Sequence, residues 1–520
     1  MTARKRSICK FIIAGLLPFP ACASSAGLAD AAMHRDRATV NALLDDKADV
    51  NAAQPDGATA LQWAARFDDL DLAAQLIRAG ANPKAANRDG ATPLFLATEN
   101  GSASMIRLLL EAGADPNAAI LSHGETPLMM AARAGNPEAV KILLDHGAQV
   151  NAAETLRGTT ALMWAAEQGH AAAVQLLLDH GAEVNAQSKI LTPIGRRGLG
   201  FANSTVLFGN SERSRAKARQ IGGLTALLFA AREGALDSVR ALVAAHADVN
   251  LPSVDGSSPL VVAVQNGFYS VAEYLMDHGA NPNTANDKGW TPLYLAVKNR
   301  NQEITAVPGP SKDGALEFIT RLLDRGADPN VQIKAETEVH QGMSALWLKE
   351  AGATPLLRAA LCGDLTVVKL LLAHNADPEI TTFDHTTPLM VASGVGWAEG
   401  MLREYSEDQT LEVVKILLDH GADVNTANDH GITALHGAAY KGANKAVQLL
   451  VDRGANLEAK DKGEDFGFGV RSVKMTPLNW AEGVPIGMAS AIYHADTVAL
   501  LSRLMKDRGI PVVTNALAAQ

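Results

Sequence analysis

Apolar residues recur along most of the chain in the spacing of short helices that bury one face. Many segments place them at positions i, i+3 and i+4, as in Val140, Leu143 and Leu144. A shorter apolar segment precedes each of these, begins after a Thr or Ser, and often ends at a glycine such as Gly135. The pattern therefore predicts pairs of short helices, and each pair is joined to the next by a loop rich in Gly, Asn and Asp.

The helix pairs repeat with a regular period. Thr or Ser, then Pro or Ala, then Leu marks the start of each first helix, at positions 59, 92, 126, 160, 225, 258, 291, 354, 387, 433 and 476. The successive starts lie 33 or 34 residues apart, except at four places where additional sequence intervenes. Such a period is typical of a solenoid, in which each unit buries its apolar face only by stacking on its neighbours.

The marker residues have a direct structural role. A Thr hydroxyl accepts a hydrogen bond from the free amides of a first helical turn. Pro at the next position costs nothing there, because its missing N–H would have had no partner. We therefore expect each marker Thr or Ser to cap a helix.

With these residues the unit resembles the ankyrin repeat, whose first helix begins Thr-Pro-Leu-x-x-Ala. The phrase stands at Thr92-Pro93-Leu94 and Thr126-Pro127-Leu128, and a histidine form stands at Thr433-Ala434-Leu435-His436. The resemblance runs from about Leu28 to Met505. It implies an all-α ankyrin-repeat solenoid of helix-turn-helix units with projecting β-hairpin-like loops. We expect a degenerate capping repeat and loop over 24–58, regular repeats over 59–185, repeats with insertions over 222–505, and a C-terminal tail over 506–520.

Six insertions interrupt the repeats after position 185. Three precede a marker residue, on the edge where the loops project: 186–221, 331–351 and 462–475. Three separate the two helices of a repeat, on the opposite edge: 300–314, 394–409 and 484–496. Insertions in repeat proteins map to loops that often carry function, so these segments are candidates for it.

The insertion 186–221 differs from the rest of the chain in charge. It carries seven Lys or Arg and one Glu, within a chain of formal net charge −10. Two interpretations stay open: a docking segment for an acidic partner or for an acidic surface of this same chain, and a solvated flexible loop. The insertion 394–409 is acidic, which would allow the two segments to associate.

Arg358 occupies a position that other repeats fill with apolar residues such as Trp63 and Trp480. A guanidinium buried there needs a partner, because an unpaired buried charge is very costly. Glu338 and Glu350 in the insertion 331–351 are candidates, and such a pair would hold that insertion over the first helices. The alternative is an Arg358 side chain that reaches solvent.

The first 23 residues have the layout of a secretory signal peptide. Four basic residues precede an apolar run over 11–17, and Ala21-Cys22-Ala23 follows as a cleavage site. An apolar N-terminal helix and a lipoprotein anchor at Cys22 are the alternatives. Cleavage near Ala23 would leave a periplasmic or secreted chain and would lower the net charge from −10 to −14, because residues 1–23 carry four positive and no negative charges. That charge argues against nucleic-acid and membrane binding.

The sequence contains no recognisable catalytic, phosphate-binding or metal-binding motif. Six histidines are placed at the end of the second helix, where a ring can bind the last carbonyls: His146, His180, His246, His278, His374 and His420. Being one per repeat, they cannot converge on a metal. Cys362 is expected to be a packing residue. We therefore expect no enzyme, cofactor or metal.

Protein binding is the remaining function. Ankyrin-like proteins bind partners through loop tips and the exposed positions of first helices. The matching residues are Phe67, Glu99, Arg133, Gln168, Arg232, Gln265, Lys298, Tyr440 and Lys441, with Trp290 at a loop tip and Arg358 beside the insertions. The chain resembles exported bacterial ankyrin-repeat proteins, which predicts a non-catalytic protein-protein interaction scaffold. The alternatives are an accessory or protective subunit of an exported enzyme and, less favoured, an enzyme whose site is built from the C-terminal insertions.

Overall fold

The computed structural model describes residues 27–119, 123–192, 220–301, 314–335, 348–397, 406–463, 473–484 and 492–514. These residues form helices in two compact units, Met1–Gln149 and Val150–Gln520. Within the described ranges no strand is present, and two isolated antiparallel bridges join Ala153 to Thr160 and Leu191 to Ile221. The all-α prediction is therefore confirmed, and the projecting loops are tight turns rather than paired strands.

Each repeat consists of a first helix, here called inner, and a second helix, here called outer. In unit 1 the inner helices are α1 (Gly27–Met33), α3 (Ala60–Arg66), α5 (Pro93–Asn100) and α7 (Pro127–Ala134). The outer helices are α2 (Arg37–Asp45), α4 (Leu70–Arg78), α6 (Ala103–Glu111) and α8 (Pro137–Asp145). Each inner helix packs on the next inner helix and on its own outer helix.

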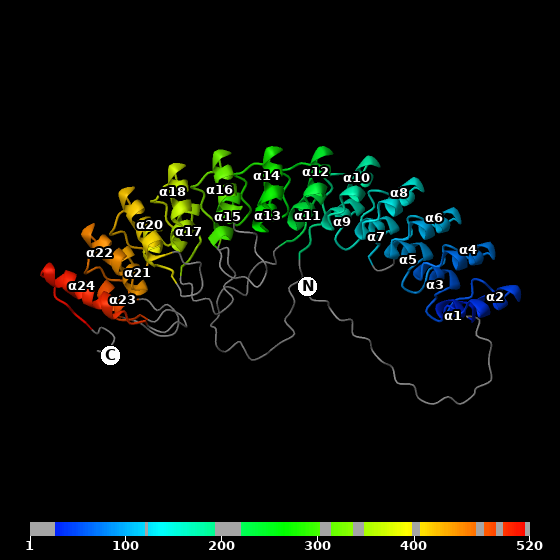
Figure 1. Ribbon diagram of the computed structural model, residues 1–520, viewed down its shortest axis with the longest axis horizontal. Helices are drawn as coiled ribbons and strands as arrows, with labels where there is room; N and C mark the ends of the chain where they lie inside the picture. The colour runs from blue at the N-terminus through cyan, green and yellow to red at the C-terminus, as the bar shows by residue number, and fades with distance from the viewer. Residues whose placement is uncertain are drawn as a thin grey trace, which may run out of the picture. The chain divides into compact units, whose positions relative to one another are not determined.

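Unit 2 continues the same pattern. Its inner helices are α9 (Ala161–Glu167), α11 (Ala226–Glu233), α13 (Pro259–Gln265), α15 (Pro292–Asn301), α17 (Pro355–Cys362), α19 (Pro388–Ser393), α21 (Ala434–Lys441) and α23 (Pro477–Ala481). Its outer helices are α10 (Ala171–Asp179), α12 (Leu236–Ala244), α14 (Tyr269–Asp277), α16 (Ala315–Asp324), α18 (Leu365–Ala373), α20 (Glu407–Asp419), α22 (Asn444–Asp452) and α24 (Ala495–Asp507). Figure 1 shows the two rows within each unit. Helices α9 and α11 pack directly although the insertion 186–221 lies between them in sequence, so that insertion does not interrupt the stack.

Marker residues cap most of the inner helices as expected, but the buried Thr59 hydroxyl makes no cap hydrogen bond. The Thr92 and Thr354 hydroxyls each accept a hydrogen bond from the amide three residues on, at 3.2 Å. At Thr433 the amide instead donates to Nδ1 of His436, at 3.2 Å. The buried His436 ring also places Nε2 3.2 Å from the Met475 carbonyl of the next repeat.

Five of the six histidines cap an outer helix as predicted. Nδ1 of His146, His180, His278, His374 and His420 lies 2.7–2.9 Å from the carbonyl four residues earlier. The prediction for His246 is wrong, because this histidine lies one residue further along its repeat than the other five, and Ala245 takes the C-cap position of α12. His246 takes the place of the terminal glycine and has a positive φ of 64°.

An Asn at the base of each of several loops ties one repeat to the next; we call this series the Asn relay. Nδ2 of Asn425 donates to the Gly454 carbonyl at 3.1 Å, and its Oδ1 accepts from the Asn456 amide at 2.8 Å. Equivalent pairs of bonds are made by Asn51, Asn117, Asn151, Asn250, Asn283 and Asn330.

A second series of bonds joins the loop tips of neighbouring repeats; we call it the loop-tip row. In each case a tip amide of one repeat donates to a tip carbonyl of the repeat before it, as from Lys189 to Arg157 at 2.7 Å. In unit 2 the series continues from Val254 to Gly222, Asp287 to Asp255, Lys334 to Lys288, Phe383 to Ala351, Asp429 to Asp384 and Lys462 to His430. The tips are thereby held at fixed positions on the stacked helices.

Candidate protein-binding surface

The seventh residue after each marker Thr or Ser reports whether the inner-helix face is open. This residue is exposed or half-buried in α3 to α15, where it is Arg66, Glu99, Arg133, Glu167, Arg232, Gln265 and Lys298 in turn. It is buried in the last four repeats, where it is Leu361, Gly394, Tyr440 and Gly483. The inner-helix face is therefore open up to α15 and covered from α17 to α23.

The chain covers this face with its own insertion residues. Val395, two residues after the end of α19, packs on Gly437 in α21 so closely that a Cβ on Gly437 would lie 2.6 Å from the Val395 nitrogen. Leu348 packs in the same way on Gly396, where a Cβ would lie 2.7 Å from that of Leu348. The described ends of the insertions 331–351 and 394–409 thus contact each other and the inner helices.

Aromatic rings complete the cover around Tyr440, which is 3% exposed. The Tyr440 ring meets the Trp397 and Trp480 rings edge-on, with centroids 6.1 and 5.9 Å away. Burial raises the pKa of the Tyr440 phenol. The neutral, enclosed phenol suits a residue of the packed interior. It offers no accessible surface to a partner protein.

Arg358 is 1% exposed and forms an ion pair with Glu350. The alternative that its side chain reaches solvent is therefore wrong, and Glu338 lies outside the described residues. The pair belongs to a pattern that the sequence reasoning missed. At the same helix position the indole of Trp480 donates to Asp461 at 2.7 Å, and that of Trp63 donates to Gln54 at 2.8 Å. The sequence contained a signal for this pattern, because each of these three donors is preceded in its own repeat by a loop residue that can accept: Gln54, Glu350 or Asp461.

The structure places the other predicted residues as follows. Glu99, Arg133, Gln168 and Gln265 are exposed, and Phe67, Arg232, Lys298 and Lys441 are half-buried. Three residues proposed as partner contacts are buried: Arg358, Tyr440 and Trp290. The expectation of an exposed Trp290 is wrong, because the ring is 8% exposed and its indole donates to the Ala335 carbonyl at 3.0 Å.

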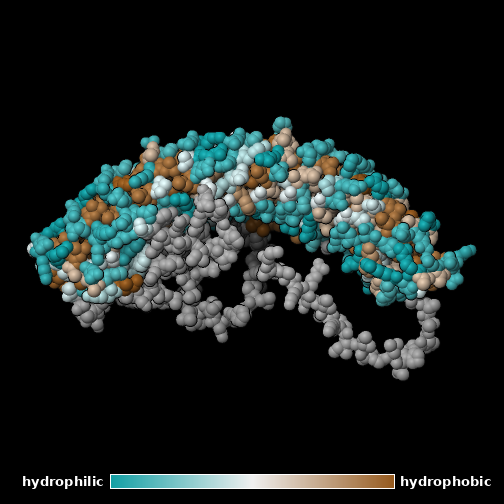
Figure 2. Space-filling model, viewed as in Figure 1, coloured by the Kyte–Doolittle hydropathy of each residue, from teal (hydrophilic) through white to brown (hydrophobic). Residues whose placement is uncertain are grey.

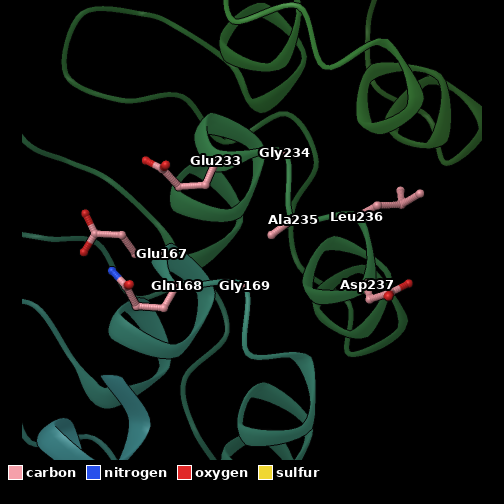
Figure 3. A pocket seen from close by; sticks show the side chains of 8 residues that line it. All are labelled: Glu167, Gln168, Gly169, Glu233, Gly234, Ala235, Leu236 and Asp237. Carbon is pink, nitrogen blue, oxygen red and sulfur yellow. The ribbon is translucent and has the colours of Figure 1, made fainter. Parts of the chain in front are cut away.

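The open face of unit 2 contains a groove of about 850 Å³ between α9 and the α11–α12 turn. Figure 3 shows Glu167 and Gln168 at the end of α9, Glu233 at the end of α11, and Asp237 at the start of α12. Arg232 contacts two of these carboxylates, Glu167 at 2.6 Å and Glu233 at 2.9 Å. The charged side chains that line the groove are the carboxylates of Glu167, Glu233 and Asp237, and Gln168 adds an amide that can donate and accept hydrogen bonds.

The described residues contain no group of three or more His, Cys, Asp or Glu side chains able to hold a metal ion. Within the same part of the chain, none of the helices combines the length and apolar character that crossing a bilayer needs. Cys362 is buried at 5% exposure, with Sγ 3.9 Å from the Asn301 carbonyl.

Comparison with known proteins identifies the repeat. A family model described as ankyrin repeats (3 copies) matches residues 28–120, 118–188, 207–286, 227–307 and 402–461, which is more than half of the chain. The chain belongs to the ankyrin-repeat family. A single-repeat model, described as ankyrin repeat, also matches residues 288–334 and 351–383. Ankyrin repeats typically bind protein partners, and the family is generally non-catalytic.

Several curated proteins resemble parts of this ankyrin-repeat chain. Putative ankyrin repeat protein YahD of Escherichia coli (strain K12) is 28% identical over 182 residues, which are 33% of this chain and 90% of that protein. E3 ubiquitin-protein ligase KEG of Arabidopsis thaliana is 30% identical over 278 residues, 49% of this chain and 16% of that protein. Rabankyrin-5 of Homo sapiens is 25% identical over 305 residues, 55% of this chain and 23% of that protein. The chain thus spans less than a quarter of the length of the two larger relatives.

Proposed function

We propose that this ankyrin-repeat chain is an exported, non-catalytic scaffold that binds a protein partner through the open inner-helix face and loop tips of each unit. In unit 1 the face comprises α3, α5 and α7, and in unit 2 it comprises α9 to α15. The observation that carries the proposal is the change in exposure along unit 2. A polar face with accessible side chains is present where the family binds partners, and it ends where insertion residues cover α17 to α23.

The face has the polar composition of a recognition surface that is exposed to water until a partner binds. In each unit the face carries charges of both signs, Glu99 and Arg133 in unit 1 and Glu167 and Arg232 in unit 2. Such surfaces contribute specificity and association rate more than raw affinity. Figure 2 shows that hydrophilic residues cover most of the visible surface of the described helices.

The test is capture of partners by a chain that starts at residue 24, followed by measurement of affinity for the protein found. A variant with Gln168→Arg and Gln265→Arg changes two exposed inner-face side chains. Lys415→Glu on the exposed face of α20 is the matched control. We expect the inner-face variant to weaken binding at least about tenfold, because an unmatched arginine at each position must be desolvated. Equal binding by both variants would contradict the proposed surface.

Export rests on the first 23 residues and has a separate test. Fractionation of the producing cell followed by mass spectrometry should find a mature chain that begins near Ser24. A chain that begins at a lipid-modified Cys22 would make the protein membrane-anchored. A cytoplasmic chain that retains residues 1–23 would overturn the export proposal and leave the binding proposal standing.

A further inference from the structure

Three exposed aliphatic residues belong to the loop tips of two adjacent repeats in unit 2. Leu156, Ile190 and Ile221 are 51%, 56% and 53% exposed. Their backbones adjoin, because Lys189 donates to Arg157 at 2.7 Å and Leu191 and Ile221 exchange hydrogen bonds of 2.7 and 2.9 Å. Isolated exposed aliphatic residues are ordinary, whereas a group of them at one place indicates a contact surface.

Two cations flank these side chains. Arg157 and Lys189 are exposed, and Nζ of Lys189 lies 2.8 Å from the Thr155 carbonyl to which it donates. Among the described residues 152–159, 187–192 and 220–224, Glu154 is the single carboxylate, and it is 3% exposed. The Glu154 carboxylate accepts hydrogen bonds from the Leu156 and Arg157 amides, so it fixes the loop tip from beneath.

The tips are held in one conformation before any partner arrives. Besides the loop-tip row, close packing of two glycines fixes their spacing. A Cβ on Gly158 would lie 2.7 Å from Cγ of Lys189, and a Cβ on Gly222 would overlap the Lys189 carbonyl. A surface organised in advance binds more tightly, because less conformational entropy is lost on association.

We propose that Leu156, Arg157, Lys189, Ile190 and Ile221, here called the tip patch, bind a protein segment that carries carboxylates beside aliphatic or aromatic side chains. The aliphatic residues would contact its apolar side chains, and the two cations would pair with its carboxylates. This inference rests on the proposed scaffold function and specifies the chemistry of the partner.

A narrow protein segment fits this patch better than an anionic membrane does. The next two loop tips along unit 2 carry two carboxylates, Asp255 and Asp287, and one cation, Lys288, and the chain has a formal net charge of −10. A flat anionic surface laid on this edge would meet those carboxylates as well as the cations, whereas a segment a few residues long meets the tip patch alone.

The test uses a fluorescein-labelled synthetic peptide that repeats Asp-Leu-Glu-Leu, with matched peptides that carry Lys for the acids or Ser for the leucines. Fluorescence anisotropy with the full chain should show binding of the first peptide at least about tenfold tighter than either control peptide, and weaker binding as salt rises. Arg157→Glu with Lys189→Glu, and separately Leu156→Ser with Ile190→Ser, should each lower the affinity at least about tenfold. Lys415→Glu on α20 should leave it unchanged. Unchanged melting temperatures would show that the variants fold, since all four side chains are exposed.

Three results would overturn the inference. The first is equal binding of the three peptides, or equal binding by the tip-patch and Lys415→Glu variants. The second is patch-dependent sedimentation with phosphatidylglycerol vesicles but no patch-dependent binding of the acidic peptide, which would assign the patch to a membrane. The third is patch-dependent dimerisation of the chain at low salt without peptide binding, which would assign it to a second copy. If binding of the captured partner is weakened by the Gln168 and Gln265 substitutions but not by the tip-patch substitutions, this inference fails while the scaffold function stands. If neither set of substitutions weakens binding, both proposals fail.

Discussion

At the scale of single residues, Arg358 shows how one position accepts chemically different side chains. The same inner-helix position holds Leu96 and Val262, which have no side-chain donor, and Trp480, whose indole donates to Asp461 in the loop of its own repeat. Arg358 forms an ion pair there with Glu350, and the two side chains are 1% and 9% exposed. A buried ion pair of this kind fixes a conformation more than it adds net stability.

Removing one member of this pair should therefore cost more than removing both. We expect Glu350→Ala to lower the free energy of unfolding by about 3–5 kcal/mol, because it leaves a buried guanidinium without its carboxylate. Glu350→Leu combined with Arg358→Leu should cost clearly less. Urea unfolding monitored by circular dichroism, with hydrogen exchange to locate the loss, measures both. A double variant as unstable as the single one would show that the pair itself contributes the stability.

Glu154 makes stability depend on pH. Burial acts to raise its pKa, but hydrogen bonds from the Thr159 amide and hydroxyl and from the Arg157 and Leu156 amides outweigh burial and hold the pKa below the ordinary 4.5. A lowered folded-state pKa contributes stability that is fully present above the unfolded value and is lost as pH falls through the folded value.

We therefore expect Glu154→Gln to lower the melting temperature at pH 7 and to have a smaller effect below about pH 4. Thermal unfolding of the two proteins from pH 7 to pH 3 provides the comparison. The exposed Glu183, changed to Gln, is the control. A constant difference between wild type and Glu154→Gln across this range would contradict the role given to the carboxylate.

At the scale of elements, the inner helix α21 contains a glycine where helices ordinarily disfavour one. Replacing an interior helical Gly with Ala ordinarily stabilises a protein by about 0.5–1 kcal/mol. At Gly437 we expect the opposite sign, because the new Cβ would lie 2.6 Å from the Val395 nitrogen. Hydrogen exchange should show faster exchange at residues 394–397 in Gly437→Ala. Gly27→Ala in α1, where the nearest atom is 3.9 Å away, is the control. Unchanged protection at 394–397 would show that Val395 does not depend on this close approach.

The comparison of α21 with the insertions shows what the sequence predicts and what it does not. The helix pairs follow from local signals, because the marker Thr and the 33-residue period specify each start. The cover over α17 to α23 depends on contacts such as Leu348 with Gly396, between residues of two different insertions. These contacts have no period and no local signature. Sequence reasoning therefore placed Tyr440 and Trp290 on the surface, although it correctly offered Glu350 as a partner for Arg358.

At the scale of the molecule, the Asn relay makes the stability of one repeat depend on its neighbour. Within this relay the Asn425 side chain donates one hydrogen bond to the Gly454 carbonyl and accepts another from the Asn456 amide. Asn425→Ala removes both, and we expect it to lower the free energy of unfolding by about 1–2 kcal/mol. The midpoint of urea unfolding measures the loss. Asn266→Ala, which removes an exposed bond within the α13 repeat, is the control and should cost less. An equal loss would mean that coupling between repeats does not depend on the relay.

The covered face of α17 to α23 has an evolutionary consequence. Residues that meet a partner diverge as partners change, whereas residues enclosed by the chain itself diverge only as packing allows. Among relatives that keep the insertions, Leu361 and Tyr440 should therefore vary little, and Glu99 and Gln265 should vary freely. Relatives that have lost the insertions should regain polar residues at the positions of Leu361 and Tyr440, because loss of the cover would turn an interior back into a surface.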